Sequence, residues 1–263
     1  MADFWTRYRR NSAAVLGLGI LLTILIMAAT AHLFYPEDPF RLVGRPLSGP
    51  LENGFLLGSD SLGRDVASGI VHGAKTSLLI GLIATLVSVF IGIFFGAFAG
   101  YFGGRIDDLL MRITEIFQTI PSFIFAILLV AIMKPSIVSI VIAIAVVSWP
   151  GVARLVRGEF LSLKNREFVQ ACHTLGMSDL RVMMREILPN CLSPIIVIGS
   201  LMVATAILIE SGLAFLGLGD PNIMSWGFQI GAGRTMLRSA WWVCTFPGVC
   251  LLYTSDAADD LWC

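Results

Sequence analysis

Residues 154–194 read RLVRGEFLSLKNREFVQACHTLGMSDLRVMMREILPNCLSP, and this polar stretch decides the architecture of the chain. It carries six Lys and Arg residues and lies between two segments that are apolar enough to cross a membrane. The hydrocarbon core of a bilayer has no water to satisfy charged and polar groups, so a run of this kind belongs outside it. We therefore predict a membrane protein that meets a soluble partner through this loop.

The composition of the whole chain agrees with a membrane protein. Of its 263 residues, 56% are hydrophobic and only 14% are charged, whereas a soluble domain carries about 25% charged residues. The formal net charge is zero, so nothing points to nucleic acid or to an acidic substrate. The five cysteines show no CxxC pair and no metal-ligand spacing. We expect Cys172 and Cys191 in the loop to be apolar filler, and we predict no cofactor or metal.

Two short helices separated by a glycine are predicted inside the polar run. Gly176 is a natural stop for the first helix, and Ser178 can cap the second, which Leu188-Pro189 should end. Apolar residues recur at helical spacing in each helix: Phe168, Ala171, Cys172 and Leu175, then Leu180, Met183, Met184 and Ile187. These residues alone leave two interpretations open, a unit that docks in another protein and a hairpin that lies on the membrane.

An uncharged run from Ser12 to about Phe34 is long enough to be a first membrane span. Arg7, Arg9 and Arg10 precede it and should keep the N-terminus in the cytoplasm. The alternative is a cleaved signal peptide, because residues 29–31 are small, but the apolar run exceeds the length of a signal core.

Residues 35–74 are polar, rich in Pro and Gly, and are predicted to form an external loop. Their end is one residue short of a phosphate-binding loop, because Ala74 stands where the second glycine of GxxxxGK[ST] is needed before Lys75 and Thr76. We therefore expect a loop and a short interfacial helix here, not a nucleotide site.

The second span is predicted from Lys75 to Phe102 and has a stripe of small residues. Small residues four apart lie nearly on one helix face and let another helix approach closely in lipid. The sequence does not say whether that helix belongs to this chain or to a partner. The stripe consists of Ala84, Ser88, Gly92, Gly96, Gly100 and Gly104.

A third span is predicted from about Leu109 to Met133, with a kink at Pro121. Its first turns place Arg112, Glu115 and Gln118 on one face, and polar groups entering a membrane must face protein or water. Two interpretations remain open for this face, a lining of the transport pathway and an intramolecular ion pair near the cytoplasmic interface.

The fourth span is predicted from Ser136 to about Val156, with a bend at Pro150-Gly151. Ser193-Pro194 resembles a helix start and should open the fifth span, which reaches about Leu218. Glu210 lies inside this span, where it is either functional or simply satisfied by a neighbouring helix or by protonation.

Residues 220–238 are predicted to be external, and the tryptophans 226, 241 and 242 suit an interfacial belt. The sixth span should begin near Ala240, but its apolar run stops at Tyr253 and is too short to cross. The acidic residues 254–263 are atypical of a cytoplasmic flank. We expect them to result from a truncated or chimeric reading frame, and a native short tail is the alternative. The predicted divisions are thus 1–74 (first helix and external loop), 75–253 (five further helices and the loop 154–194) and 254–263.

The run EFVQACHTLGMSDLRVMMREILPN resembles the coupling loop, or EAA motif, of bacterial importer permeases of the ATP-binding-cassette (ABC) class. Gln170, Ala171 and Cys172 stand in the EAA place, with Gln170 for its glutamate and Cys172 for its second alanine. Glu186 stands where the motif prefers isoleucine. The resemblance implies an ATPase-coupling site at Glu167, Gln170, Ala171, Cys172, Gly176, Asp179, Leu188 and Pro189.

Three further stretches are similar to the dipeptide/oligopeptide/nickel group, specifically its second, C-type permease, over roughly residues 10–250. They are LLGSDSLGRDVASGIVHGAKTSL, SWPGVARLVRGEFLSLKNREFVQA and ESGLAFLGLGDPNIMSWG. The resemblance implies an all-α fold with six transmembrane helices in the bacterial inner membrane. It also implies a second permease, two cytoplasmic ATPases that hydrolyse the ATP, and a periplasmic or lipid-anchored binding protein that delivers peptides, nickel complexes or related solutes.

Two other classes of function remain as alternatives. A self-powered secondary transporter or channel would need its own coupling or gating residues, for which the sequence offers Glu210 and the pair Arg112 and Glu115. A membrane-embedded enzyme would need a catalytic cluster, but the three histidines are scattered and neither HExxH nor GxSxG occurs.

Overall fold

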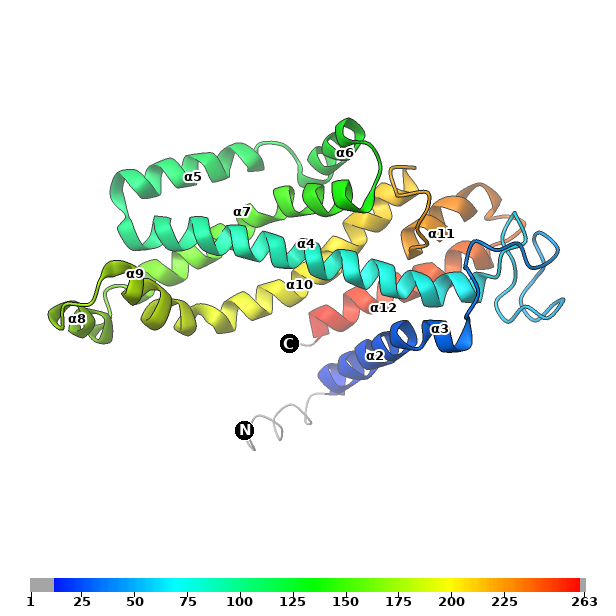
Figure 1. Cartoon of the computed structure of the whole chain (residues 1–263), viewed down its shortest axis with the longest axis horizontal. Helices are drawn as coiled ribbons and strands as arrows, with labels where there is room; N and C mark the ends of the chain where they lie inside the picture. The colour runs from blue at the N-terminus through cyan, green and yellow to red at the C-terminus, as the bar shows by residue number, and fades with distance from the viewer. Residues whose placement is uncertain (1–11, 261–263) are drawn as a thin grey trace. The chain divides into compact units, whose positions relative to one another are not determined.

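The computed structural model describes residues 12–260, and within this range it is helical, with one isolated β-bridge between Ser59 and Asp65 (Figure 1). The α-helices are α2 (Ser12–Ala29), α3 (Ala31–Phe34), α4 (Val66–Phe102), α5 (Gly104–Gln118), α6 (Ser122–Met133), α7 (Ile137–Leu163), α8 (Glu167–Thr174), α9 (Asp179–Val182), α10 (Leu188–Phe215), α11 (Trp226–Gly233) and α12 (Trp242–Asp260). A π-helical turn, η1 (Met183–Ile187), joins α9 to α10, and a 3₁₀ turn, η2 (Arg234–Met236), follows α11.

The chain forms two compact units that interleave in sequence. Unit 1 contains residues 1–82, 130–141 and 203–263, and unit 2 contains residues 83–129 and 142–202. The long helices α4, α7 and α10 each contribute to both units. Membership of a unit therefore follows contacts in space and not order along the chain.

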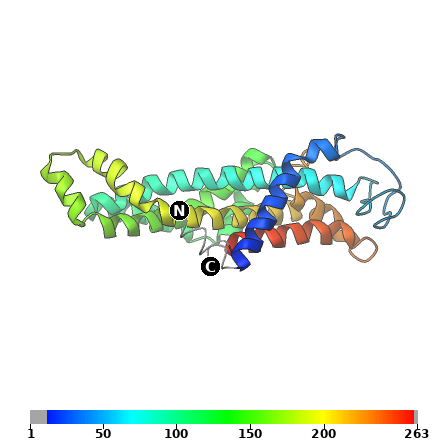
Figure 2. The same ribbon diagram turned by 90° about the horizontal axis from the view of Figure 1, so that it is seen from below.

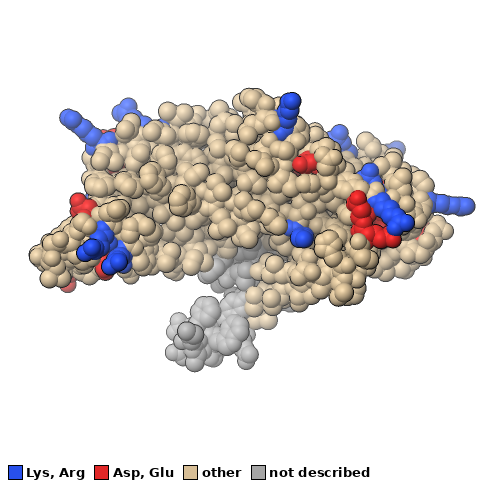
Figure 3. All heavy atoms as spheres, in the orientation of Figure 1, with Lys and Arg blue, Asp and Glu red and all other residues tan. Residues whose placement is uncertain are grey.

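Apolar helices account for most of the described chain. Three are long and apolar enough to cross a membrane: 66–102, 137–163, and the continuous run 179–215 through α9, η1 and α10. A fourth candidate is the pair α5 and α6, which are bent by 80° to one another, and two shorter apolar helices cover 17–29 and 242–255. On the face drawn in Figure 3, charged residues are sparse among the others, as a lipid environment requires.

Unit 1 is built around two tryptophans that the sequence placed at a membrane interface. Trp226 is completely buried and its indole N–H donates to the carbonyl of Ile70 at 2.9 Å. Trp242 is 8% exposed and donates to the carbonyl of Ser59 at 3.1 Å. The interfacial prediction is wrong for these two, because the chain itself supplies both the apolar surroundings and the hydrogen-bond acceptor. Trp241 is exposed.

The small-residue stripe of α4 packs within unit 2 against α7 of the same chain. A Cβ on Gly92 would lie 2.4 Å from Val152 Cβ, and one on Gly96 would lie 2.4 Å from the carbonyl oxygen of Ala153. On Gly100 it would lie 2.6 Å from Phe160 Cβ. Only glycine permits this approach of two backbones. The structure thus answers the open question about this stripe, while Gly104 lies outside it as the first residue of α5, with φ +53°.

Several predicted helix boundaries are wrong. The α4 helix begins at Val66, in the predicted external loop, and α7 continues to Leu163, inside the predicted polar loop. Residues 220–238, predicted as an external segment, contain α11 and η2. The apolar pattern marks the part of a helix that lipid or core covers, and helices continue beyond that part where neighbouring segments satisfy their ends. The break near Pro121 is confirmed, since α5 ends at Gln118 and α6 begins at Ser122.

The predicted helix end at Leu188-Pro189 and the predicted start at Ser193-Pro194 are also wrong, because the helix runs through both prolines. In the π-helical turn before Pro189, the Leu188 N–H donates to the carbonyl of Met183, five residues back. The wider turn makes room for the Pro189 ring, which an ordinary α-turn would exclude. Because proline has no backbone N–H, it needs no hydrogen-bond acceptor in this turn.

Candidate functional site

The polar loop of unit 2 folds into the predicted pair of helices, α8 and α9, about a glycine. Gly176 has φ +76°, in the left-handed region that favours glycine at a helix end. Ser178 occupies the N-cap position of α9, although its side chain makes no capping hydrogen bond. Figures 1 and 2 both show α8 lying beyond the end of α7.

A buried face on each loop helix anchors the loop. It contains Met183 and Ile187 of the second predicted stripe, whereas on α8 the buried residue is Val169, which lies outside the predicted stripe. Val169, Val182, Met183 and Ile187 are at most 1% exposed and belong to one core cluster with Val152, Val156 and Phe160 of α7. This burial fixes α8 and the α9–η1 turn on the ends of the spanning helices. The loop is therefore an integral part of unit 2.

Most of the first predicted stripe, and Leu180 and Met184 of the second, are uncovered in the described chain. Leu175 is 81% exposed and lies in the turn after α8, and Leu180 is 61% exposed in α9, at the loop end of the run 179–215. Phe168, Ala171 and Met184 are also exposed. Exposed apolar residues of this kind fit either a protein partner or the membrane surface. We call these five residues the loop tip.

Tyr101, in the last turn of α4, ties the loop to that helix. Its hydroxyl donates to Asp179 Oδ1 at 2.7 Å and lies 3.4 Å from His173 Nε2. One side chain thus contacts both loop helices. The sequence did not identify Tyr101, because no local pattern relates residues that are so far apart along the chain.

The predicted coupling residues occupy two settings. Glu167, Gln170, Ala171 and Gly176 are exposed in or beside α8, whereas Cys172 is partly buried against the core. Asp179 is the first residue of α9 and accepts the bond from Tyr101. Leu188 packs against the core and Pro189 is exposed, both in the first turn of α10.

A charged cavity of about 570 Å³ lies between α5 and α7 in unit 2. Asp107 accepts two hydrogen bonds from Arg157, at 2.5 and 2.6 Å, in a bidentate ion pair. Arg112 and Glu115, the pair that the sequence singled out, line the same cavity but form no ion pair with any side chain that the structure describes. The cavity is lined by Asp107, Asp108, Met111, Arg112, Thr114, Glu115, Arg154 and Arg157.

Glu210, in α10 of unit 1, is 2% exposed and is surrounded by hydroxyl groups. Ser225 Oγ donates to its Oε1 at 2.7 Å and Ser211 Oγ to its Oε2 at 3.3 Å, and Ser77 of α4 also contacts it. Ser225 caps α11 by accepting from the Phe228 N–H. Glu210 therefore fixes α11 to α10 and α4, and it does not line the charged cavity between α5 and α7.

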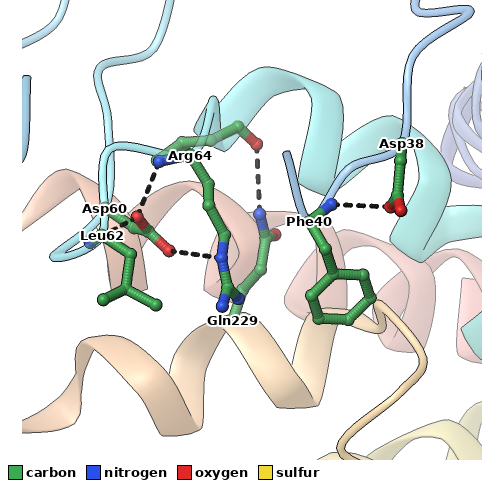
Figure 4. Close-up of polar contacts among 7 residues, drawn as sticks. Asp38, Phe40, Asp60, Leu62, Arg64 and Gln229 are labelled. Carbon is green, nitrogen blue, oxygen red and sulfur yellow. Dashed lines mark hydrogen bonds and ion pairs between the residues drawn. The ribbon is translucent and has the colours of Figure 1, made fainter. Parts of the chain in front are cut away.

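The loop before α4 is also packed into unit 1. Asp60 Oδ1 accepts from the Leu62 and Arg64 N–H groups at 2.8 Å, and the Arg64 guanidinium lies over the Phe40 ring (Figure 4). Gln229 of α11 donates to the carbonyl of Val66 at 3.2 Å. This loop packs on the first turn of α4 and shields it from solvent. The helix can therefore start earlier than its hydropathy indicates.

Two family profiles match the chain. The profile described as the binding-protein-dependent transport system inner membrane component matches residues 92–261, and the one described as the N-terminal TM domain of oligopeptide transport permease C matches residues 1–47. Together they cover most of the sequence.

Characterised relatives align over nearly the whole chain. The dipeptide transport system permease protein DppC of Escherichia coli strain K12 is 41% identical over 97% of this chain and 87% of its own length. The oligopeptide transport system permease protein OppC of the same strain is 40% identical over 96% and 84%. The di/tripeptide permease protein DppC of Pseudomonas aeruginosa strain UCBPP-PA14 is 39% identical over 96% and 86%.

The fold resembles solved structures of the MetNI methionine ABC transporter in inward-facing conformations. One such chain superposes with a TM-score of 0.60 at 17% identity, covering 72% of this chain and 91% of that one. A second crystal form gives 0.58 at 14% identity, covering 73% and 93%. At these identities the likeness establishes an importer permease fold and no more.

Proposed function

Because this chain belongs to the family of inner membrane components of binding-protein-dependent transport systems, we propose that it forms, with a second permease, the pathway of an ABC importer for short peptides. The family consists of transport permeases, so ATP hydrolysis belongs to separate subunits. Family membership also favours this function over a self-powered transporter. The peptide substrate is proposed from the curated relatives, which are named as dipeptide, di/tripeptide and oligopeptide permeases.

The complete assembly contains this chain, a second permease, two cytoplasmic ATPases and a substrate-binding protein. The N-terminus lies in the cytoplasm, and the loop between the fourth and fifth of six spans lies on the same side. The positive residues of the polar loop support this orientation.

The loop tip is the observation that carries the proposed docking. Its apolar residues are exposed while their neighbours in the same helices are buried, so α8 and α9 have one face for unit 2 and one face for a partner. A cytoplasmic ATPase that binds this face would move it together with the core beneath it. Tyr101 passes that displacement to α4 through Asp179. Such coupling requires that the ATPase bind the two conformations of the permease differently.

The test is to co-express this chain with its second permease and two ATPases and to change the loop tip. In Leu175→Asp/Leu180→Asp, two exposed apolar residues become charged, so we expect the chain to fold and the ATPases to be lost from the purified complex. Leu51→Asp is the matched control, because Leu51 is 80% exposed in the loop before α4, against 81% for Leu175. ATPase retention by the double variant would refute docking at the loop tip.

The coupling step is tested separately with Tyr101→Phe. This variant keeps the ring but removes the hydrogen bond to Asp179, so ATPase binding should persist while peptide uptake per ATP hydrolysed falls several-fold. An unchanged ratio of uptake to hydrolysis would show that Tyr101 plays no part in coupling.

A further inference from the structure

The charged cavity between α5 and α7 has equal numbers of positive and negative groups. Three arginines and three carboxylates line it, and the bidentate pair Asp107–Arg157 accounts for one of each. The other four, Asp108, Arg112, Glu115 and Arg154, form neither an ion pair nor a side-chain hydrogen bond with any side chain that the structure describes, although Asp108 also interacts electrostatically with Arg157. The cavity therefore has no net charge, and it offers two arginines and two carboxylates that are not held in close ion pairs.

The cavity lies toward the loop end of unit 2. The α5 helix starts directly after α4, whose last turn carries Tyr101 in contact with Asp179 of the loop. A Cβ on Gly103 would lie 3.5 Å from Lys164 Nζ, just beyond the end of α7. Arg154 precedes the end of α7 by nine residues, or about 14 Å at 1.5 Å per residue. With the loop in the cytoplasm, as proposed above, the cavity occupies the inner half of the membrane.

Charged side chains at this depth must face protein or water, and leaving four of them unpaired is costly unless water or a ligand visits the cavity. A net-negative ligand would be attracted by the arginines but repelled by Asp108 and Glu115. A ligand with one ammonium and one carboxylate matches both sets at once. Arg guanidinium groups bind carboxylates in a bidentate manner, and carboxylates accept from ammonium groups.

We propose that this cavity is a subsite for the free zwitterionic termini of a short peptide, at the inner end of the transport pathway. Arg112 and Arg154 receive the peptide carboxylate, and Asp108 and Glu115 receive its ammonium group. The ion pair of Asp107 with Arg157 holds α5 against α7 and so keeps Arg154 of α7 beside the three charged groups of α5. The inference rests on the proposed peptide substrate and adds where the peptide is bound before release.

The size and exposure of the site agree with this role. A cavity of about 570 Å³ lies within the usual range of about 300–1,000 Å³ for small-molecule sites. Arg112, Glu115, Asp108 and Arg154 are all exposed in the described chain, so the peptide remains in contact with water. A pathway site must bind weakly enough to release its cargo, and partial exposure ensures weak binding.

The test measures dialanine binding to the whole importer, without its binding protein, in nanodiscs by saturation-transfer NMR. We expect a dialanine signal in the wild type that falls at least threefold in Arg112→Gln/Arg154→Gln and also falls in Glu115→Gln. N-acetyl-alanine amide has no charged terminus and should give a weak signal throughout. Arg105→Gln is the matched control, because Arg105 is an exposed arginine of α5 outside the cavity and should leave the dialanine signal unchanged.

Three outcomes overturn the inference: no dialanine signal in the wild type, equal signals in wild type and double variant, or an equal loss in Arg105→Gln. Loss of co-purified phosphatidylethanolamine from the double variant, with the dialanine signal intact, would assign the cavity to a lipid headgroup. ATP-driven dialanine uptake by the wild type with its binding protein is measured in parallel. Failure of that uptake counts against the proposed function. Successful uptake, together with equal dialanine signals in the wild type and the double variant, counts only against the subsite.

Discussion

Glu210 in unit 1 and Glu115 in unit 2 are carboxylates of the same chemistry in opposite surroundings. Both lie in helices of largely apolar segments, and the sequence marks both as candidates for function. Glu210 is almost completely buried and bonded to serine hydroxyls from three parts of the chain. Glu115 is exposed in a cavity and has no ion-pair partner among the side chains that the structure describes.

The difference separates groups that hold the protein together from groups that are available to a ligand. A buried carboxylate whose oxygens are all bonded can be removed only at a cost in stability. An exposed carboxylate without a partner contributes little to stability and is free to bind. Partners and exposure, more than residue type, therefore indicate which charged group serves transport.

The largest effect should come from Glu210→Ala. It leaves hydroxyl groups unpaired and a cavity at the junction of α10, α4 and α11, so we expect a loss of about 3 kcal/mol in stability. Thermal unfolding of the purified importer, followed by tryptophan fluorescence, measures it. Glu115→Ala should leave the melting temperature nearly unchanged, and equal losses in the two variants would erase the contrast between the two sites.

A smaller effect is expected from Gly96→Ala, which extends the comparison of buried and exposed positions to the backbone. Its Cβ would lie 2.4 Å from the carbonyl oxygen of Ala153, so α4 and α7 must separate, at a cost of about 1–3 kcal/mol. Gly158→Ala is the control in α7, because its Cβ would meet nothing within 4 Å. Alanine there should stabilise the helix by about 0.5–1 kcal/mol. The same thermal assay would contradict the close packing if both variants were stabilised.

The smallest effect concerns Asp65, a carboxylate of intermediate burial just before α4. Burial raises the pKa of Asp65 above its ordinary value, although its Oδ1 accepts from the Ala67 N–H at 2.9 Å. The folded state then binds the proton more tightly than the unfolded state, so Asp65 contributes stability at acid pH that is lost as pH rises through the raised pKa.

Asp65→Asn keeps an oxygen that can accept from Ala67 and removes the titration. The melting temperature of the wild type minus that of the variant should fall as pH rises from acid to neutral. The corresponding change in the free energy of unfolding should be less than about 1 kcal/mol, because solvent screens a half-buried group. A difference that stays constant or rises with pH would contradict the direction of the pKa shift.

Much of the candidate site could be predicted from local sequence. The helix pair about Gly176 follows from apolar spacing and from the conformational freedom of glycine, and the structure confirms it. The face with Arg112 and Glu115 follows from helical periodicity. Local spacing could not show that Asp107 pairs with Arg157, or that Leu175 is exposed while Val169 is buried, because both depend on α7.

The sequence by itself determined that this protein is a helical membrane protein with a polar helical loop, because hydropathy, charge and glycine chemistry act within a few residues, and its motifs pointed to the permease family by resemblance. Only the tertiary structure decided which neighbours each group meets. The glycine stripe packs on α7, Trp226 and Trp242 enter the core, and the helix continues through Pro189 across a π-turn. Burial and pairing arise between segments that lie far apart along the chain, so they become visible only when the helices are placed side by side.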